Sequence, residues 1–371
     1  MQTRSLVILI LAALARAAPS AAAEDAMRLH FIDVGQGAAT LVEFPCAAIL
    51  VDTGGERSPP QGTPVVYDST PALLKYLTAF FAGRPDLAGR LAQIIVTHPH
   101  PDHTRGLAEV FKRFHPANVV YNGQYGFGQT EIMERVQQGE ARGWFVLQRR
   151  TTRKLGLTNE VIDPVTCSST HTTNPRIRAL WGQLTDATGW DASAFRNMNN
   201  HSVVTRVDYG EASVLFTGDL EEKDREKPGA KAAGIERLLD QFKDSPILDV
   251  DVYQVGHHGS HNGTTRALVR AMSPEIAVIA AGPPCKRGEF SAWDHGHPRK
   301  ETLEELESGV TRTNARTVSV FEAEEVKPVS MAIKKAIYST SWDGTIVLSG
   351  RSNGDWRVVS TSGPHACVKA E

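Results

Sequence analysis

Several features are scarce or missing in this sequence, and each absence excludes a class of protein. Cysteine occurs only 4 times in 371 residues, at positions too widely spaced for a Cys-x-x-Cys zinc knuckle or redox motif. The formal charge of −2 provides no global basic field to recruit nucleic acid or an anionic membrane, so a polyanionic substrate must be bound locally. Internal repeats are absent, and 41% hydrophobic with 22% charged residues describes a globular chain rather than a fibrous or disordered one.

Long hydrophobic runs are also missing. The apolar run over residues 5–14 is too short to cross a bilayer and follows a short basic segment that ends at Arg4. This arrangement predicts a secretory signal over residues 1–23, with cleavage near Ala21 to Ala23 and a secreted or periplasmic mature protein. An uncleaved anchor is the alternative. No later stretch is long and apolar enough to form a membrane helix, so we expect no stable membrane span after processing.

The disulfide pattern is left open by the sequence. In an exported protein, Cys46, Cys167, Cys285 and Cys367 could form no disulfide, one or two. Four cysteines allow three pairings, and their spacing does not choose among them.

The first part of the mature chain has the pattern of short strands and helices. Apolar runs separated by glycine turns predict a meander of strands over residues 27–34, 39–44 and 47–51. Helical spacing follows over residues 71–81. A buried strand over residues 94–97 then runs directly into a histidine-rich loop and a helix over 106–114.

The rest of the chain begins with an irregular segment and ends in an alternating one. Residues from about 123 to 195 are interpreted as an insertion near the active face, with one helix around 131–139. A hairpin is expected over residues 202–217, and a second one over 336–349 around an Asp-Gly turn. Between them, alternating helices and strands are predicted over residues 235–242, 250–255, 264–272, 276–281, 300–308 and 317–323.

Three histidines and an aspartate lie close together after the strand over residues 94–97. In an extended stretch, His98 and His100 project to the same side, so both can reach one metal ion. The bend that follows allows Asp102 and His103 to face a second ion. A solvated histidine-rich loop is the alternative interpretation.

Three further motifs follow later strands. Asp219 ends the first predicted hairpin, where its carboxylate could bridge two cations or form a simple turn. His257 and His258 lie between glycines after an apolar strand, a position that core packing does not explain well. His297 occupies a Gly-His-Pro turn, where it could bind a substrate anion, transfer a proton or serve a structural role.

The motifs keep a definite order along most of the chain. They are Phe31-Ile-Asp-Val-Gly-Gln-Gly37, Ile49-Leu-Val-Asp-Thr-Gly54, the segment from Thr97 to Gly106, Asn199-Asn200-His201-Ser202, Leu215-Phe-Thr-Gly-Asp-Leu220, Gly256-His-His-Gly-Ser260 and Gly296-His297-Pro298. Together they resemble the metallo-β-lactamase superfamily, and within it the ComEC-like branch. The resemblance implies an α/β fold, a four-layer αββα sandwich with a metal site at one edge of two facing sheets. We therefore expect a hydrolase domain over residues 24–327 and a small C-terminal β-hairpin extension over residues 328–371.

The resemblance also implies a ligand set for two divalent metal ions. In this set His98 and His100 hold the first metal, Asp102 and His103 hold the second, and Asp219 bridges them. His257 is the expected remaining ligand of the second metal, with His258 as its rival, and His297 contacts the leaving or anionic group of the substrate. Zinc is the expected metal, with manganese and iron as alternatives.

Two positions depart from the family pattern. Many relatives have an aspartate after the Gly-Gln-Gly turn, where this chain has Ala38, so the role of that carboxylate is absent here. Superfamily members outside this branch usually supply a third histidine to the first metal from the segment before Asp219. The corresponding stretch here is Asn199-Asn200-His201, and either His201 or an asparagine could take that place.

A function follows from this set of residues. Two cations would lower the pKa of a bridging water from about 15.7 toward neutrality, which makes a hydroxide nucleophile without a protein base. We therefore expect an exported binuclear hydrolase that cleaves a phosphodiester or related ester by a metal-bridged hydroxide. Asp102, which could orient the water or accept a proton, and His297 are the expected catalytic residues.

The substrate and two other functions stay open. Nucleic acid could bind the basic cluster over residues 149–154, and a small phosphodiester with a cationic group could be caged by Trp190, Trp293 and Tyr125. A β-lactam or lactone hydrolase is one alternative, and a non-catalytic binding module on the same scaffold is the other. No protein partner is predicted.

Overall fold

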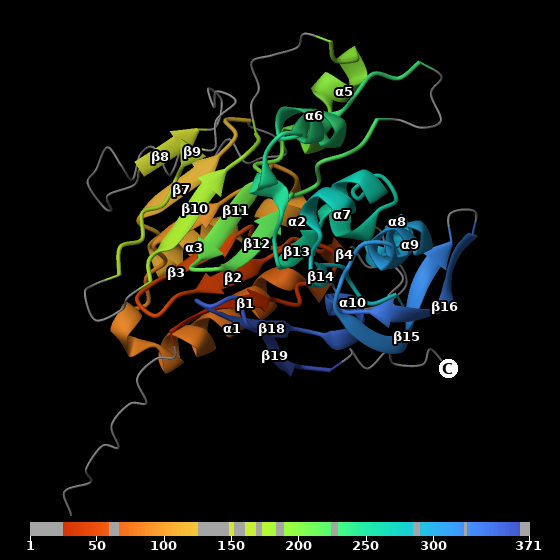
Figure 1. The fold of residues 1–371 in the computed structure, drawn as a ribbon. Coiled ribbons are helices and arrows are strands. Elements are labelled where there is room, and N and C mark those ends of the chain that lie inside the picture. The colour runs from red at the N-terminus through yellow and green to blue at the C-terminus, as the bar shows by residue number, and fades with distance from the viewer. Residues whose placement is uncertain are drawn as a thin grey trace, which may run out of the picture.

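Two facing β-sheets with helices on both outer sides form the fold (Figure 1). The structure is a computed structural model that describes residues 25–58, 67–124, 148–151, 160–167, 173–182, 189–223, 229–284, 290–322 and 325–363. One hydrophobic core lies between the sheets and one lies beneath the helices on each side. The four-layer αββα sandwich expected from the sequence is confirmed.

The first sheet contains the strand that leads to the histidine-rich loop. Its order is β19-β18-β1-β2-β3-β6-β7-β8. The strands are β1 (Ala26–Phe31), β2 (Thr40–Glu43), β3 (Ala48–Val51), β6 (Gln93–Ile95), β7 (Asn118–Tyr121), β8 (Gln148–Thr151), β18 (Ile346–Arg351) and β19 (Trp356–Thr361). Pairing is antiparallel from β19 to β3 and parallel from β3 to β8, so β3 and β6 end at the same edge.

The second sheet carries the other candidate motifs. Its order is β17-β14-β13-β12-β11-β10-β9. The strands are β9 (Glu160–Val161), β10 (Pro175–Ala179), β11 (Thr205–Tyr209), β12 (Ala212–Phe216), β13 (Val252–Val255), β14 (Ile276–Ile279) and β17 (Ile337–Ser339). The strands β12, β13, β14 and β17 run parallel, which brings their carboxyl ends to one edge.

Alternating side chains build the core between the sheets. Phe31 of β1, Tyr209 of β11 and Phe216 of β12 are among its largest members, and all three are almost fully buried. Burial of each such side chain stabilises the fold by about 1.5–3 kcal/mol before the entropy cost of ordering it.

Helices close the two outer faces. On the first sheet lie α1 (Ser69–Gly83) and α3 (Leu107–Phe114), and on the second lie α6 (Gly234–Gln241), α7 (Arg266–Met272) and α9 (Lys300–Glu307). The first of these helices begins at Asp68, whose carboxylate accepts a 2.8 Å hydrogen bond from the Thr70 amide, and buries Leu73, Leu77 and Phe81. The shorter helices are α2 (Pro101–Thr104), α5 (Ala192–Arg196), α8 (Ala292–His295) and α10 (Thr340–Asp343), with 3-10 turns η1 (Pro85–Leu87), η3 (Met198–His201), η4 (Pro246–Leu248) and η5 (Gly256–Gly259).

The C-terminal segment corrects one sequence interpretation. The expected hairpin over residues 336–349 is wrong, because its two strands join different sheets: β17 pairs with β14, and β18 pairs with β1. A short helix, α10, precedes the Asp343-Gly344 turn between them. The C-terminal hairpin is instead formed by β18 and β19, and it widens the first sheet. A second hairpin, β15 (Thr313–Glu322) with β16 (Glu325–Lys335), includes the predicted domain boundary at residue 327.

A disulfide links the two halves of the sandwich. Cys46, between β2 and β3, is bonded to Cys167, which precedes β10 of the second sheet. The two cysteines are separated by 121 residues in the sequence. Cys285, Cys367, the predicted signal and the expected helix around 131–139 lie outside the described residues.

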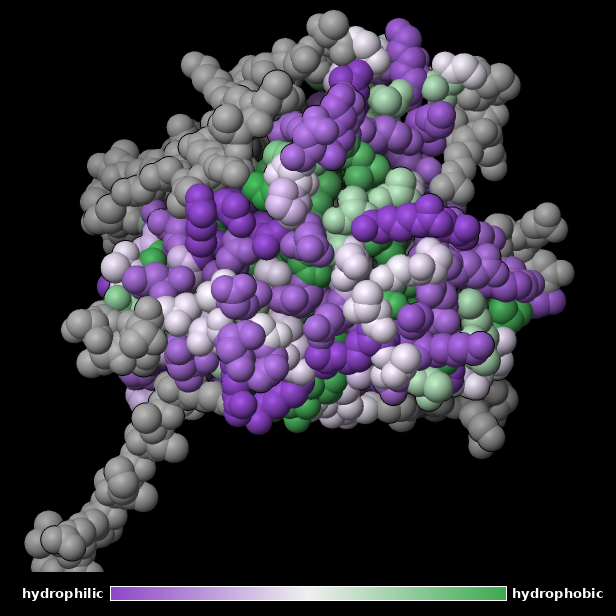
Figure 2. All heavy atoms as spheres, viewed as in Figure 1, coloured by the Kyte–Doolittle hydropathy of each residue, from purple (hydrophilic) through white to green (hydrophobic). Residues whose placement is uncertain are grey.

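Polar side chains cover most of the face seen in Figure 2, and apolar ones are scattered among them. Among the described residues, Phe290, Val358 and Val359 are the large hydrophobic side chains with substantial exposure. None of the helices in the described part of the chain combines the length and the apolar character needed to cross a membrane.

Candidate metal centre

The loop after β6 carries the first group of candidate ligands. His98 and His103 are buried, and His100 and Asp102 are partly exposed. His98 Nε2 lies 3.0 Å from His100 Nδ1, so these two imidazoles converge as the extended spacing predicts. Asp102 and His103 follow within α2, where the chain bends.

Asp52 supports this loop from the end of β3. Its Oδ1 accepts a 2.8 Å hydrogen bond from the Thr97 amide, and its Oδ2 accepts a 2.9 Å hydrogen bond from the Thr97 hydroxyl. The same Oδ2 lies 2.7 Å from His103 Nδ1. Because an ionised carboxylate only accepts, His103 carries a proton on Nδ1 and turns Nε2 toward the opposite side.

The second sheet supplies the other half of the cluster. Asp219 follows β12, and its Oδ1 lies 3.1 Å from His103 Nε2. His258 follows β13, and its Nε2 lies 3.1 Å from His103 Nε2 and 3.2 Å from Asp102 Oδ2. One potential ligand atom from each of Asp102, His103, Asp219 and His258 lies within 4.8 Å of the others.

The adjacent histidines of η5 point in different directions. Both have positive φ, 49° for His257 and 53° for His258, so the backbone turns sharply between glycines. His258 Nδ1 donates to the Ala280 carbonyl at 2.8 Å, which leaves Nε2 to face the carboxylates. His257 Nδ1 lies 2.8 Å from Asn262 Oδ1, and its Nε2 stands 3.9 Å from Asp219 Oδ2. The compact group of four therefore contains His258, and His257 lies beside it.

Charge and burial shift the pKa values in the cluster. Burial lowers the pKa of His98, and the neighbouring His103 lowers it further. Burial also opposes protonation of His103 and His258, but the surrounding carboxylates together outweigh it. Asp219, Asp52 and Asp102 raise the pKa of His103 well above its ordinary value, and Asp219 and Asp102 raise that of His258 to about 10. Despite its burial, Asp219 has a pKa well below the usual range because these two imidazoles face it.

This donor set fits a metal ion. Buried imidazoles and carboxylates are the usual ligands of Zn²⁺ and related divalent cations. The two imidazoles with raised pKa values hold protons between ionised carboxylates, and a divalent cation would supply the same positive charge at the same place. The cluster could therefore hold metal ions.

His297 lies next to the cluster and is oriented by Gln36. The side-chain amide of Gln36 accepts from the Gly282 amide through Oε1 at 3.4 Å and donates through Nε2 to His297 Nδ1 at 3.1 Å. The proton of neutral His297 is therefore on Nε2. Burial and the neighbouring His257 hold the pKa of His297 well below its usual value.

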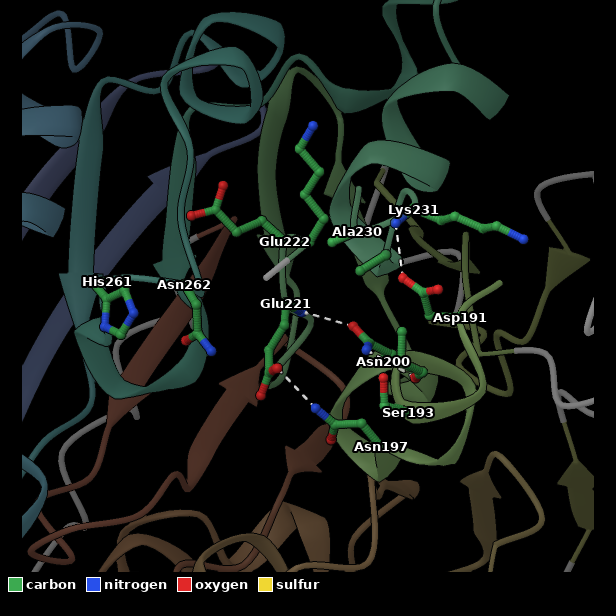
Figure 3. Close-up of a pocket in the computed structure, with 13 residues that line it drawn as sticks. Asp191, Ser193, Asn197, Asn200, Glu221, Glu222, Ala230, Lys231, His261 and Asn262 are labelled. Carbon is green, nitrogen blue, oxygen red and sulfur yellow. Dashed lines mark hydrogen bonds between the residues drawn. The ribbon is translucent and has the colours of Figure 1, made fainter. Parts of the chain in front are cut away.

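A pocket of about 430 Å³ opens onto the cluster. Its lining includes His100, Asp102, Asn199, Asp219 and His257. Phe290, which is 62% exposed, also lines it. A second pocket of about 500 Å³ is lined by Asn197, Asn200, Glu221 and other residues (Figure 3).

His201 and Asn200, two candidates for the third ligand of the first metal, have other partners. His201 Nε2 lies 2.6 Å from the Phe195 carbonyl, and its ring stacks on Trp190 at 5.6 Å between centroids. Asn200 Oδ1 accepts from the amides of Glu221 and Gly234, both at 3.3 Å, as Figure 3 shows for Glu221. Both side chains are engaged away from the four-residue cluster.

The other expected binding residues are also accounted for. Trp190 packs in the hydrophobic core against Trp181, so it does not form part of a cage at the pocket. Trp293 lies in α8 and is partly exposed. Tyr125 and most of the basic cluster over residues 149–154 lie outside the described residues.

Sequence reasoning assigned no role to Asp52 and Gln36, and it named Asn199 only as one of two asparagines that could replace a third histidine. Asp52 and Gln36 belong to quoted motifs, but nothing in their spacing shows which imidazole each one orients. The signal available was their position at a turn after an apolar strand, where α/β folds place functional groups.

Comparison with known proteins gives matches over most of the chain. Residues 32–282 match the model of the metallo-beta-lactamase superfamily. The chain is 27% identical over 286 residues to Recombination protein 2 of Haemophilus influenzae and 25% identical over 303 residues to ComE operon protein 3 of Bacillus subtilis. These alignments cover 76% and 75% of this chain but 28% and 30% of the relatives, so the chain spans less than a third of their length.

A solved structure gives a weaker match. The metallo-beta-lactamase fold protein YhfI from Bacillus subtilis covers 88% of this chain and 100% of its own, at 12% identity and a TM-score of 0.43. The ComEC-like resemblance inferred from the motifs is confirmed by the competence and recombination proteins as distant homologues.

Proposed function

The chain belongs to the metallo-β-lactamase superfamily, and on this premise we propose that it hydrolyses phosphodiester or related ester bonds with two divalent cations. One observation carries the proposal. Asp102 and His103 from the first sheet and Asp219 and His258 from the second meet within 4.8 Å beside a pocket of about 430 Å³. Ligand side chains that converge from separate parts of the chain are typical of a metal site.

The proposed ligands divide into two groups. His98 and His100 would hold one cation, whereas Asp102, His103 and His258 would hold the other, and Asp219 would be available to both. His258 replaces His257 in this assignment, because its Nε2 lies 3.5 Å from Asp219 Oδ2 and 3.2 Å from Asp102 Oδ2. When bound, the cations would activate a water molecule and polarise the electrophilic oxygen of the substrate.

The residues around the cluster then perform the remaining steps. Asp102 orients the attacking water by accepting a hydrogen bond from it on a carboxylate oxygen. His297 presents its Nε2 proton to the leaving oxygen, since Gln36 occupies Nδ1. Asp52 keeps His103 in the tautomer that turns Nε2 to the cluster.

A phosphodiester is the favoured substrate because charge develops on both the attacking and the leaving oxygen, which two cations offset. The names of the distant homologues refer to recombination and competence, which supports DNA as one candidate substrate. A small-molecule phosphodiester is the other. We also propose export, which is supported by the Cys46–Cys167 disulfide because disulfides persist in oxidising compartments.

The test is a substrate comparison on the full-length protein loaded with Zn²⁺ or Mn²⁺. We expect turnover of bis(p-nitrophenyl) phosphate to exceed that of a chromogenic cephalosporin, and Asp219→Asn to abolish it. Asp240→Asn, which changes an exposed carboxylate on α6, is the matched control and should leave turnover unchanged. Labelled single- and double-stranded DNA then separates nucleic acid from small substrates. Faster cephalosporin turnover, or none of any substrate by metal-loaded protein, would overturn the proposal.

A further inference from the structure

Asn199 presents a buried acceptor to the pocket at the cluster. The residue lines that pocket together with His100, Asp102 and Asp219 and is only 7% exposed. Its Oδ1 is buried and accepts no hydrogen bond from the part of the chain that the structure describes. Buried polar atoms are almost always satisfied, so this oxygen requires an explanation.

Glu221 fixes the direction of this oxygen. Asn199 Nδ2 donates to Glu221 Oε1 at 2.6 Å. A carboxylate only accepts hydrogen bonds, so the amide nitrogen must face Glu221 and Oδ1 must face away from it. The other carboxylate oxygen, Oε2, accepts a 2.8 Å hydrogen bond from Asn197 Nδ2, which holds Glu221 in place (Figure 3).

The backbone after Asn199 is tied to both ligand loops. The Val203 amide donates to the Thr97 carbonyl at 2.8 Å, next to His98. The Asp219 amide donates to Ser202 Oγ at 3.1 Å. The turn that carries Asn199 is therefore attached on one side to the loop of His98 and His100 and on the other to Asp219.

The two neighbours of Asn199 in this turn are already engaged. His201 stacks on Trp190 and bonds to the Phe195 carbonyl, and Asn200 accepts two backbone amides. Of the three consecutive side chains, Asn199 alone combines a place in the pocket with an unsatisfied acceptor.

We propose that Asn199 Oδ1 is the third protein ligand of the cation held by His98 and His100, and that Glu221 positions it. An amide carbonyl is a suitable oxygen ligand for a divalent cation, and it is a neutral, harder donor than an imidazole. The inference rests on the cation pair of the proposed function, but it does not depend on the substrate.

The test measures metal binding rather than turnover. Isothermal titration with Mn²⁺ or Zn²⁺, with metal content measured after desalting, should give two equivalents for the full-length protein. Asn199→Ala should lose one equivalent or bind it about 100-fold more weakly. Asn353→Ala changes an exposed asparagine in the β18–β19 turn and serves as the matched control.

A second variant keeps the test decisive if Asn199→Ala fails to fold. Glu221→Gln lets the amide of Asn199 rotate, because glutamine can donate as well as accept, and should weaken one equivalent about tenfold. If Asn199→Ala or Glu221→Gln binds two equivalents of metal with unchanged affinity, the inference is overturned. If in addition only KM rises, Asn199 contacts the substrate and not the metal. Fewer than two equivalents in the unmodified protein would overturn the inference and the cation pair together. If the unmodified protein binds two equivalents of metal and Asn199→Ala binds only one, but neither cleaves a phosphodiester, the inference is supported and the proposed reaction is refuted.

Discussion

His103 Nδ1 lies 2.7 Å from Asp52 Oδ2, and this contact determines which nitrogen of the imidazole faces the cluster. With the proton of Nδ1 donated to Asp52, His103 Nε2 is directed to Asp219 Oδ1 at 3.1 Å. Among the described residues, the side chain of Asp52 bonds to Thr97 and His103. It is not one of the four clustered side chains, but it sets the tautomer of one of them, His103.

Asp52→Asn therefore tests orientation without removing a ligand. The amide nitrogen of the new side chain can donate where the carboxylate accepted, so His103 is no longer held in one tautomer. We expect affinity for the cation and turnover to fall by about 10–100-fold. Metal titration and steady-state kinetics measure both, with Asp240→Asn as the control. Unchanged metal affinity would show that Asp52 only supports the fold of the loop.

The adjacent histidines provide a matched pair of variants. His258→Ala removes an imidazole whose Nε2 lies 3.1 Å from His103 Nε2, so one bound equivalent of metal should be lost or weakened by at least about tenfold. His257→Ala removes a ring that lies at the edge of the cluster and should retain both equivalents. The reverse result, with metal lost only in His257→Ala, would restore His257 as the ligand.

Metal affinity should rise with pH. Although burial opposes it, the neighbouring carboxylates, Asp219 foremost, together raise the pKa of His258 to about 10 and that of His103 above its ordinary value, so both hold protons near pH 7 without a cation. Binding must release these protons, and apparent affinity should therefore increase up to about tenfold per pH unit for each proton released. Titrations from pH 6.5 to 8.5, in buffers of different ionisation enthalpy, measure the number released. A flat profile would contradict the expectation.

Gly55 packs directly against the backbone of the histidine-rich loop. A Cβ at this position would lie 2.0 Å from the Pro101 carbonyl oxygen and 2.1 Å from Asp102 Cα, so the loop would have to move. We expect Gly55→Ala to reduce metal affinity and to destabilise the fold by about 1–3 kcal/mol. Gly83→Ala, at the end of α1, places its Cβ in open space and should be neutral or slightly stabilising. Denaturant unfolding and metal titration measure the two effects, and equal behaviour of the two variants would contradict this account.

The disulfide should contribute to stability. Cys46 and Cys167 close a loop of 121 residues, which the chain-entropy model values at about 4–5 kcal/mol. We expect a Cys46→Ser/Cys167→Ser double variant to unfold at a lower denaturant concentration than the oxidised protein. Unfolding of the unmodified protein with its disulfide reduced is the companion measurement. An unchanged midpoint in both experiments would show that the crosslink adds no stability.

The layers and the main ligand loops could be predicted because each depends on local sequence. Apolar strands that are followed by His98, Asp219 or His258 can be recognised from runs of a few residues, and parallel strands bring their carboxyl ends to one edge. The hairpin predicted over residues 336–349 failed for the opposite reason. Its alternation and Asp-Gly turn are those of a hairpin, but pairing with β14 and β1, strands far away in the chain, decided the outcome.

The finer details of the site depend on geometry that spacing does not contain. The choice between His257 and His258 follows from two successive residues with positive φ and from the Ala280 carbonyl that orients His258. The distinction between Asn199 and Asn200 follows from which backbone amides lie within reach of each side chain. The spacing of the cysteines likewise did not identify the partner of Cys46, because the pairing with Cys167 depends on how the two sheets face each other.

The candidate ligands belong to both halves of the sandwich, His103 to the first sheet and His258 to the second. An ion held between them would link the two layers at one end, in addition to the apolar core between the sheets and the Cys46–Cys167 disulfide. Chelation would remove this link, so loss of the metal would destabilise the packing of the two sheets as well as abolish the chemistry.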